Sequence, residues 1–156
     1  MRKYAKWVLL VLLVAWCVTI WQFSLAPAEK SSGTSSQVQD FCNDMLDKAG
    51  IDATVTSKTV RKTAHFSEFM LLGFLAAATL FSHGFGHWLI LSPLVFVPAA
   101  VIDECIQIFV PGRGPHILDV LLDLAGGTFG ALAFWVLFSL IIYIKNKSKE
   151  KNSKTT

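Results

Sequence analysis

The sequence predicts an all-α membrane protein, a four-transmembrane-helix bundle with a short amphipathic extracellular helix between the first and second spans. Hydrophobic residues make up 53% of the 156 residues and charged residues only 16%, which fits neither an ordinary soluble domain nor a disordered chain. Four stretches approach the roughly 20 apolar residues that a spanning helix needs, and they cover residues 7–25, 63–81, 88–110 and 117–144. Little chain is left for a separate soluble domain.

Basic residues at the two ends of the chain predict its orientation. Eight of the 14 Lys and Arg residues lie there, namely Arg2, Lys3, Lys6, Lys145, Lys147, Lys149, Lys151 and Lys154, and six lie in the segments between the ends. Lys and Arg are enriched on the cytoplasmic side of membrane proteins. We therefore expect both termini in the cytoplasm, with anionic lipid rather than nucleic acid as the partner of the tails.

These features divide the chain into four parts. Residues 1–26 form an N-terminal anchor helix, 27–60 an extracellular loop with the amphipathic helix, 61–145 a three-helix core, and 146–156 a basic cytoplasmic tail. The sequence Ala26-Pro27-Ala28 also imitates a signal-peptide cleavage site after a basic start and an apolar run. The apolar run is longer than usual for a signal peptide and has Trp at both ends, so a retained anchor is the favoured interpretation.

The extracellular loop contains a second helical pattern. Residues 31–36 are rich in Ser, Gly and Thr and are expected to be flexible. Apolar residues then recur at helical spacing between Val38 and Leu46, with Ser35 or Ser36 as the N-cap and Gly50 at the end. This helix is expected either to lie along the outer membrane surface as a cover over the bundle or to pack against the loop.

The most informative residues are ionisable groups inside the predicted spans. Each costs roughly 2.5 to 3.5 kcal/mol at the centre of a spanning helix, so such groups persist where they pair, meet water or do chemical work. With the predicted orientation and about 1.5 Å of rise per residue, all of them fall within roughly 10 Å of the outer boundary. They are His65, Glu68, Asp103, Glu104, Asp119 and Asp123, with Gln107 among them.

Helical spacing places these residues on one polar face of each span. Arg61, His65 and Glu68 follow each other at i, i+4 and i+7, and the same logic groups Asp103 and Glu104 with Gln107, and Asp119 with Asp123. On the last span the polar face continues into Gly126 and Gly130, a spacing that lets helices approach closely. The carboxylates should therefore point into the bundle. A turn of Pro and Gly residues holds Arg113 over the same opening.

Four motifs make the chain resemble the VanZ-like family of membrane proteins. They are Phe23-Ser24, Lys62-x-x-His65-Phe66-x-Glu68-Phe69, Asp103-Glu104-x-x-Gln107-x-Phe109-Val110-Pro111-Gly112-Arg113, and Asp119-Val120-x-x-Asp123-x-x-Gly126-x-x-x-Gly130. One departure is that Gly114 and Pro115 follow Arg113 where the family often has Ser. The resemblance implies a multi-pass protein of the bacterial cell membrane, part of the cell envelope. The family's namesake lowers sensitivity to the glycopeptide antibiotic teicoplanin.

The first hypothesis for function is binding without chemistry. An outward-facing charged pocket would hold a cell-wall precursor, a lipid headgroup or a drug through complementary Arg and carboxylate groups. The candidate binding residues are Arg61, Lys62, His65, Glu68, Asp103, Glu104, Gln107, Arg113, Asp119 and Asp123. No Cys/His or Ser/His arrangement of catalytic type contradicts this hypothesis.

Two alternatives stay open. The chain could be a membrane hydrolase or transferase acting on an outer-leaflet lipid-linked or cell-wall substrate, with His65 or Glu68 as general base and Asp103 and Glu104 as a second acid/base pair. The polar groups could instead form a purely structural network, with Arg113 paired to Asp119 or Glu104, and His65 to Asp123 or Glu68. No spacing forms a metal motif, although clustered carboxylates could bind Mg²⁺ or Ca²⁺. The oligomeric state is not predicted.

Overall fold

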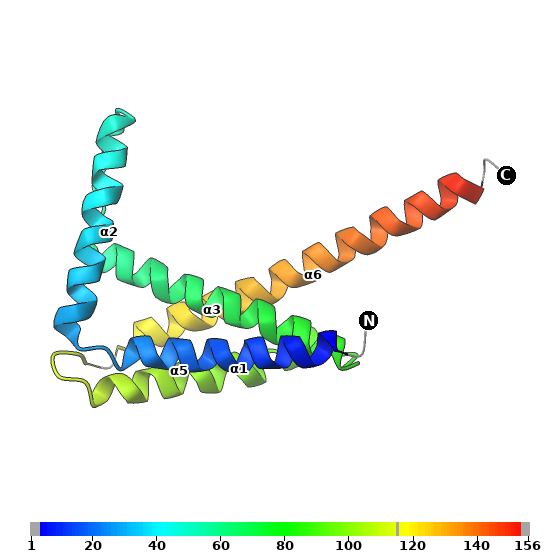
Figure 1. The fold of residues 1–156 in the computed structure, drawn as a ribbon, viewed down its shortest axis with the longest axis horizontal. Helices are drawn as coiled ribbons and strands as arrows, with labels where there is room; N and C mark the ends of the chain where they lie inside the picture. The colour runs from blue at the N-terminus through cyan, green and yellow to red at the C-terminus, as the bar shows by residue number, and fades with distance from the viewer. Residues whose placement is uncertain (1–3, 115, 154–156) are drawn as a thin grey trace.

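A computed structural model describes residues 4–114 and 116–153, which form an all-α bundle (Figure 1). The elements are α1 (Ala5–Ser24), α2 (Ala28–Lys48), α3 (Ser57–Ser82), α4 (Trp88–Leu91), α5 (Pro93–Ile108) and α6 (Ile117–Ser153). Four segments are long and apolar enough to cross a membrane: α1, α3, the α4–α5 pair and α6. The predicted fold class is therefore confirmed.

The four spans alternate in direction, so that chain ends of different helices meet. Figure 1 shows the ends of α1 and α5 beside the starts of α3 and α6 at one end of the bundle, and α2 extending away from that end past the start of α3. We call this the polar end, because the ionisable residues of the spans lie there. At the opposite end α3 turns through Gly84, which has a positive φ of 88°, into α4.

The closest contact in the bundle joins α3 and α6, and glycine makes it possible. A Cβ atom added to Gly130 would lie 1.8 Å from the backbone oxygen of Met70, and one added to Gly126 would lie 2.4 Å from that of Phe66. On α3, a Cβ at Gly73 would meet the backbone of Gly127. Backbones that approach this closely leave no room for a side chain. The predicted glycine face of the last span thus packs against α3 within the same chain.

Two apolar clusters fill the bundle. Buried residues from three spans form the cluster nearer the polar end, including Ile20, Phe69, Leu72 and Phe96. At the opposite end, Ala77, Trp88 and Ala131 are surrounded by partly buried aromatic rings of α3 and α6. We call this second group the aromatic cluster.

Helix α2 differs from the sequence prediction. It begins at Ala28, directly after the extended residue Pro27, and includes the stretch 31–36 that was expected to be flexible. Pro fixes its own backbone angle, and this favours a helix start beside it. Within the stretch, the hydroxyl groups of Ser32, Thr34 and Ser36 donate hydrogen bonds to carbonyls one turn earlier. Ser and Thr satisfied in this way are compatible with a helix.

The basic residues after the predicted last span are helical as far as the structure describes them, because α6 continues to Ser153 as one helix of 37 residues. At 1.5 Å per residue it is about 55 Å long, against about 30 Å for the hydrocarbon core of a bilayer. Figure 1 shows its second half extending well past the other helices. Residues 145–153 of the basic segment therefore continue the helix of the last span.

Candidate functional site

Three spans, α3, α5 and α6, bring most of the predicted site residues to the polar end. Helix α3 starts early because Thr56 caps it, its hydroxyl accepting a hydrogen bond from the Thr59 amide at 3.2 Å. Arg61, His65 and Glu68 follow on the first turns of α3. The last turns of α5 supply Asp103, Glu104 and Gln107, and the first turns of α6 supply Asp119 and Asp123. Among the α5 and α6 residues, none is more than 7% exposed.

Asp103 is the best-supported carboxylate of this group. It is 0% exposed, and its Oδ1 accepts a hydrogen bond from the Ser24 hydroxyl at 2.5 Å. Its Oδ2 accepts one from the Gln107 side chain at 2.9 Å. A buried carboxylate with a donor on each oxygen is held in one orientation. The contact with Ser24 also ties the end of α1 to the end of α5.

His65 lies between two buried aspartates. Its Nδ1 is 3.5 Å from Oδ1 of Asp123 and 4.0 Å from Oδ2 of Asp103. Asp123 is 0% exposed, and neither of its oxygens accepts a hydrogen bond from any residue the structure describes. The imidazole and the two carboxylates come from three different helices and form a compact cluster, in which His65 Nδ1 and both oxygens of Asp123 have no hydrogen-bond partner among the described residues.

The remaining ion pairs differ from those expected for a structural network. Arg61 pairs with Asp119 across α3 and α6, at 3.6 Å between Nη2 and Oδ2. Arg113 instead donates to the backbone carbonyl of Ser24 at 3.2 Å, and its Nε is buried without a hydrogen-bond partner in the described chain. Glu104 accepts from the His116 amide at 3.1 Å. Asp119 and Glu104 thus have partners other than Arg113, contrary to the pairings considered from sequence.

A cavity of about 520 Å³ opens beside this cluster. Its charged lining comes from Arg61, His65, Glu68 and Arg113, with Lys30 of α2. The rest of the wall is mostly small or apolar, namely Gln22, Phe23, Ser24, Ala26, Ser31, Thr34, Ser35 and Ala64. The first half of α2 thus contributes to the cavity wall, whereas the amphipathic residues between Val38 and Leu46 that were predicted to cover the bundle do not line it.

Two guanidinium groups share this cavity. Burial lowers the pKa of Arg113, the charge of Arg61 lowers it further, and only the nearby carboxylates of Asp103 and Glu68 act in the opposite direction. Arginine nevertheless keeps its charge at neutral pH. An anion placed between Arg61 and Arg113 would therefore relieve both the desolvation and the repulsion between them.

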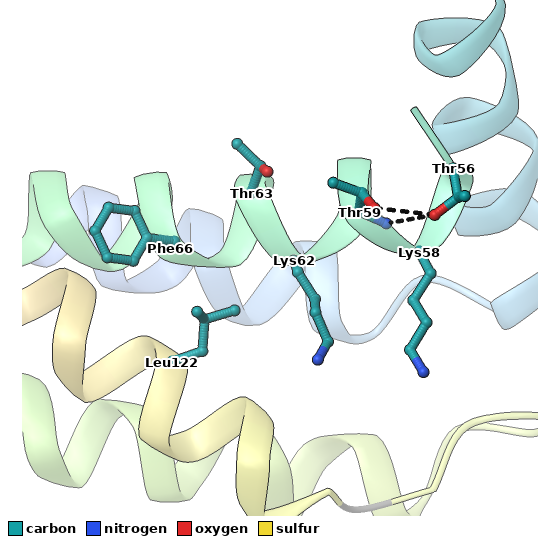
Figure 2. A pocket seen from close by; sticks show the side chains of 7 residues that line it. All are labelled: Thr56, Lys58, Thr59, Lys62, Thr63, Phe66 and Leu122. Atoms are coloured by element: carbon teal, nitrogen blue, oxygen red, sulfur yellow. Dashed lines mark hydrogen bonds between the residues drawn. The ribbon is translucent and has the colours of Figure 1, made fainter. Parts of the chain in front are cut away.

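Lys62 lies apart from the other candidates. It lines a shallower hollow of about 430 Å³ between α3 and α6, with Lys58 and Leu122. Figure 2 shows both lysine side chains pointing from α3 toward the start of α6, with Phe66 and Leu122 at the inner side. Lys62 and Arg61 are neighbours in sequence, yet they face different hollows because successive helical residues point about 100° apart. The structure therefore does not bring Lys62 to the cavity.

Ser24 contacts the site but was not among the binding residues predicted from sequence. It is 2% exposed, and it contacts Asp103 through its hydroxyl and Arg113 through its backbone carbonyl. The Phe23-Ser24 motif carries the only sequence signal for it, since a single serine at a helix end has no distinctive pattern. Pro115, part of the departure after Arg113, lies outside the described residues.

The polar end therefore combines a pair of cationic side chains with a histidine that lies between two carboxylates. Arg61 and Arg113 can hold an anionic group, and His65 stands between two carboxylates that could orient it as a base. These features define a multi-pass helical membrane protein with a charged site at one end of its spans.

The comparison with known families agrees with this class. Residues 9–140 match the family described as VanZ/LLP1, so the chain belongs to that family. The match extends from the first span into the last and includes every candidate residue of the polar end. No curated protein and no solved structure matches the chain.

Proposed function

We propose that the cavity binds the anionic headgroup of a lipid-linked molecule in the outer leaflet, such as a cell-wall precursor or a phospholipid. The observation that carries this proposal is the environment of Arg113. Its guanidinium lines the cavity, lies near the like charge of Arg61, and makes its one hydrogen bond within the described chain to a neutral carbonyl. A half-buried cation without a carboxylate in direct contact favours an incoming phosphate or carboxylate.

The cavity wall supports a lipid as the source of that anion. Phe23, Ala26 and Ala64 provide apolar surface beside the charged groups. A ligand with an apolar chain could therefore place its chain along the spans and its headgroup between the arginines. A free anion would use only the charged part of this surface.

The orientation of the chain follows the distribution of basic residues. The lysines of α6 after Tyr143 lie at the far end of the molecule from the cavity (Figure 1). With both termini in the cytoplasm, the cavity faces the exterior of a bacterial cell membrane. Glycopeptides meet their targets on that side, which links the site to the teicoplanin sensitivity associated with the family's namesake.

A second candidate function is a membrane hydrolase or transferase at the same site. The specific observation that favours it is the position of His65, which lines the cavity and lies within 4.0 Å of Asp103 and Asp123. A histidine held between carboxylates can accept a proton from water or a substrate hydroxyl. Release of phosphate from a bound lipid phosphate would distinguish this function from binding alone.

The test measures binding of dodecyl phosphate, a simple lipid phosphate, to the full chain in phosphatidylcholine nanodiscs by calorimetry. Arg113→Gln should weaken binding about tenfold, since a hydrogen bond to a charged group contributes about 1.5 to 3 kcal/mol. Lys62→Gln is the matched control, because it removes one positive charge from the same end of the bundle but not from the cavity. It should change the affinity less than about twofold.

Two outcomes would contradict the proposal. One is equal affinity of the wild type and Arg113→Gln for dodecyl phosphate. The other is equal affinity of the wild type for dodecyl phosphate and for uncharged dodecanol. In cells, Arg113→Gln at matched expression should also remove any protection against teicoplanin that the wild type confers.

A further inference from the structure

We infer that His65, Asp103 and Asp123 bind one divalent cation of the first transition row, such as Zn²⁺ or Mn²⁺. Each residue offers one ligand atom, and the three atoms lie within 4.8 Å of one another. The ligands come from α3, α5 and α6, so the site exists only in the folded bundle. They are far apart in sequence, which is why no metal motif could be recognised from spacing.

The lack of hydrogen-bond donors to Asp123 is a second observation that indicates a bound cation. Both of its oxygens are buried, and no described residue donates a hydrogen bond to either. A carboxylate buried without donors is costly unless it is paired or coordinates a metal. His65 Nδ1 is likewise buried and makes no hydrogen bond within the described chain. His65 Nδ1 and an oxygen of Asp123 therefore both have lone pairs without a donor, and they lie close enough to share one ion.

The distances within the cluster suit coordination better than direct pairing. A charge-assisted hydrogen bond is about 2.7 to 2.9 Å long. The gaps of 3.5 Å and 4.0 Å from His65 Nδ1 to the two aspartates exceed that range. Ligand atoms about 2.1 Å from a shared ion lie roughly 3.0 to 3.4 Å apart, so the three ligand atoms, which lie within 4.8 Å of one another, would draw together when an ion binds.

Hydrogen bonds also orient Asp103, as is usual for carboxylates that bind a metal. Ser24 and Gln107 donate to its two oxygens and fix the plane of its carboxylate. Such contacts leave a further lone pair on each oxygen and orient it for a metal. One imidazole with two carboxylates is a ligand set of first-row divalent ions, whereas Ca²⁺ takes six to eight oxygens.

The charge balance at the polar end favours a cation as well. The five carboxylates Glu68, Asp103, Glu104, Asp119 and Asp123 face the two guanidinium groups of Arg61 and Arg113. His65 lines the cavity, so an ion has a route to the cluster. This inference goes beyond headgroup binding, which needs Arg61 and Arg113 but no metal.

The test uses the full chain purified in detergent, stripped with a chelator and then supplied with Zn²⁺ or Mn²⁺ alone. After gel filtration, elemental analysis should find about one Zn²⁺ per chain, and Zn²⁺ should raise the melting temperature. Mn²⁺ should bind more weakly than Zn²⁺, as the general order of divalent affinities requires. No lipid phosphate is present, so a negative result leaves the headgroup proposal untouched.

Two substitutions of ligands and one control locate the ion. Asp123→Asn keeps the shape of the side chain and His65→Gln keeps most of its volume, and each should weaken Zn²⁺ binding at least tenfold. Asp44→Asn removes an exposed carboxylate that pairs with Lys48 on α2, and it should leave the affinity within about twofold. Failure of the wild type to retain Zn²⁺ would overturn the inference. So would retention by Asp123→Asn and His65→Gln equal to that of the wild type.

Discussion

The two ends of the bundle use the same helices in opposite ways. At the aromatic cluster, α3, α4 and α6 meet through apolar side chains: the ring centroids of Phe81 on α3 and Phe138 on α6 are 4.2 Å apart, and those of Trp88 on α4 and Phe134 on α6 are 5.2 Å apart. At the polar end the same two helices meet through Arg61 and Asp119 and through His65 and Asp123. One end is stabilised by packing, and the other contains charges inside a membrane span.

This contrast bears on why the charges are present. Apolar packing holds α3 to α6 at the aromatic cluster, so joining these helices does not require charged residues. A buried ion pair is often no more stabilising than apolar residues of similar volume. The polar end nevertheless contains five carboxylates, and the oxygens of Asp123 lack hydrogen-bond donors among the described residues. A binding site explains this arrangement better than helix packing does.

The largest effect should come from the contact on which both ends depend. Gly130→Leu would force a side chain into the backbone of Met70 on α3, where even a Cβ has no room. Overpacking against backbone should cost more than about 3 kcal/mol and separate α3 from α6. The measurement is thermal unfolding in detergent, followed by size-exclusion fluorescence. Gly33→Ala is the control, because nothing lies within 4 Å of a Cβ there.

A stable Gly130→Leu protein with an unchanged unfolding temperature would mean that α3 and α6 are not in contact at that glycine. The aromatic cluster and the polar end would then no longer share one support.

A smaller effect is expected where only the polar end is changed. Ser24→Ala removes the donor to Oδ1 of the fully buried Asp103, so the free energy of unfolding should fall by about 1 to 3 kcal/mol. Denaturant titration of the purified protein would measure this. Ser31→Ala is matched to it, because Ser31 also lines the cavity but makes no side-chain hydrogen bond within the described chain. Equal stability of the two variants would show that the Ser24 contact contributes nothing.

Much of the fold could be predicted from sequence because membrane spans depend on length and apolar content alone. The end of the bundle that contains the charges could also be predicted, because His65 and Asp123 fall near the same ends of antiparallel helices once the spans are set. Helical spacing then gave the correct inward face, including Gly126 and Gly130.

Partners and local extensions could not be predicted in the same way. Spacing places Arg61 near the polar face, but only the packing angle of α3 on α6 decides that it meets Asp119 and that Lys62 faces another hollow. The composition of residues 31–36 indicates flexibility, whereas Pro27 and the backbone bonds of the serine and threonine hydroxyls extend α2 through them. The pairing of Arg61 and the start of α2 depend on three-dimensional contacts that cannot be read from residue spacing or composition.

The smallest effect should come from the aromatic cluster. Phe134 packs against four aromatic rings and lies edge-on to those of Phe74 and Trp88. Phe129 is 58% exposed, and its ring contacts only Phe66 among the described aromatic rings. Phe134→Leu keeps apolar bulk but loses the ring contacts, so it should cost about 0.5 to 1.5 kcal/mol in the denaturant titration, and Phe129→Leu should cost less. Both variants should retain Zn²⁺ and dodecyl phosphate affinity, because neither residue lies at the cavity. A loss of either affinity in Phe134→Leu would show that the two ends are coupled and that the aromatic cluster positions the charged one.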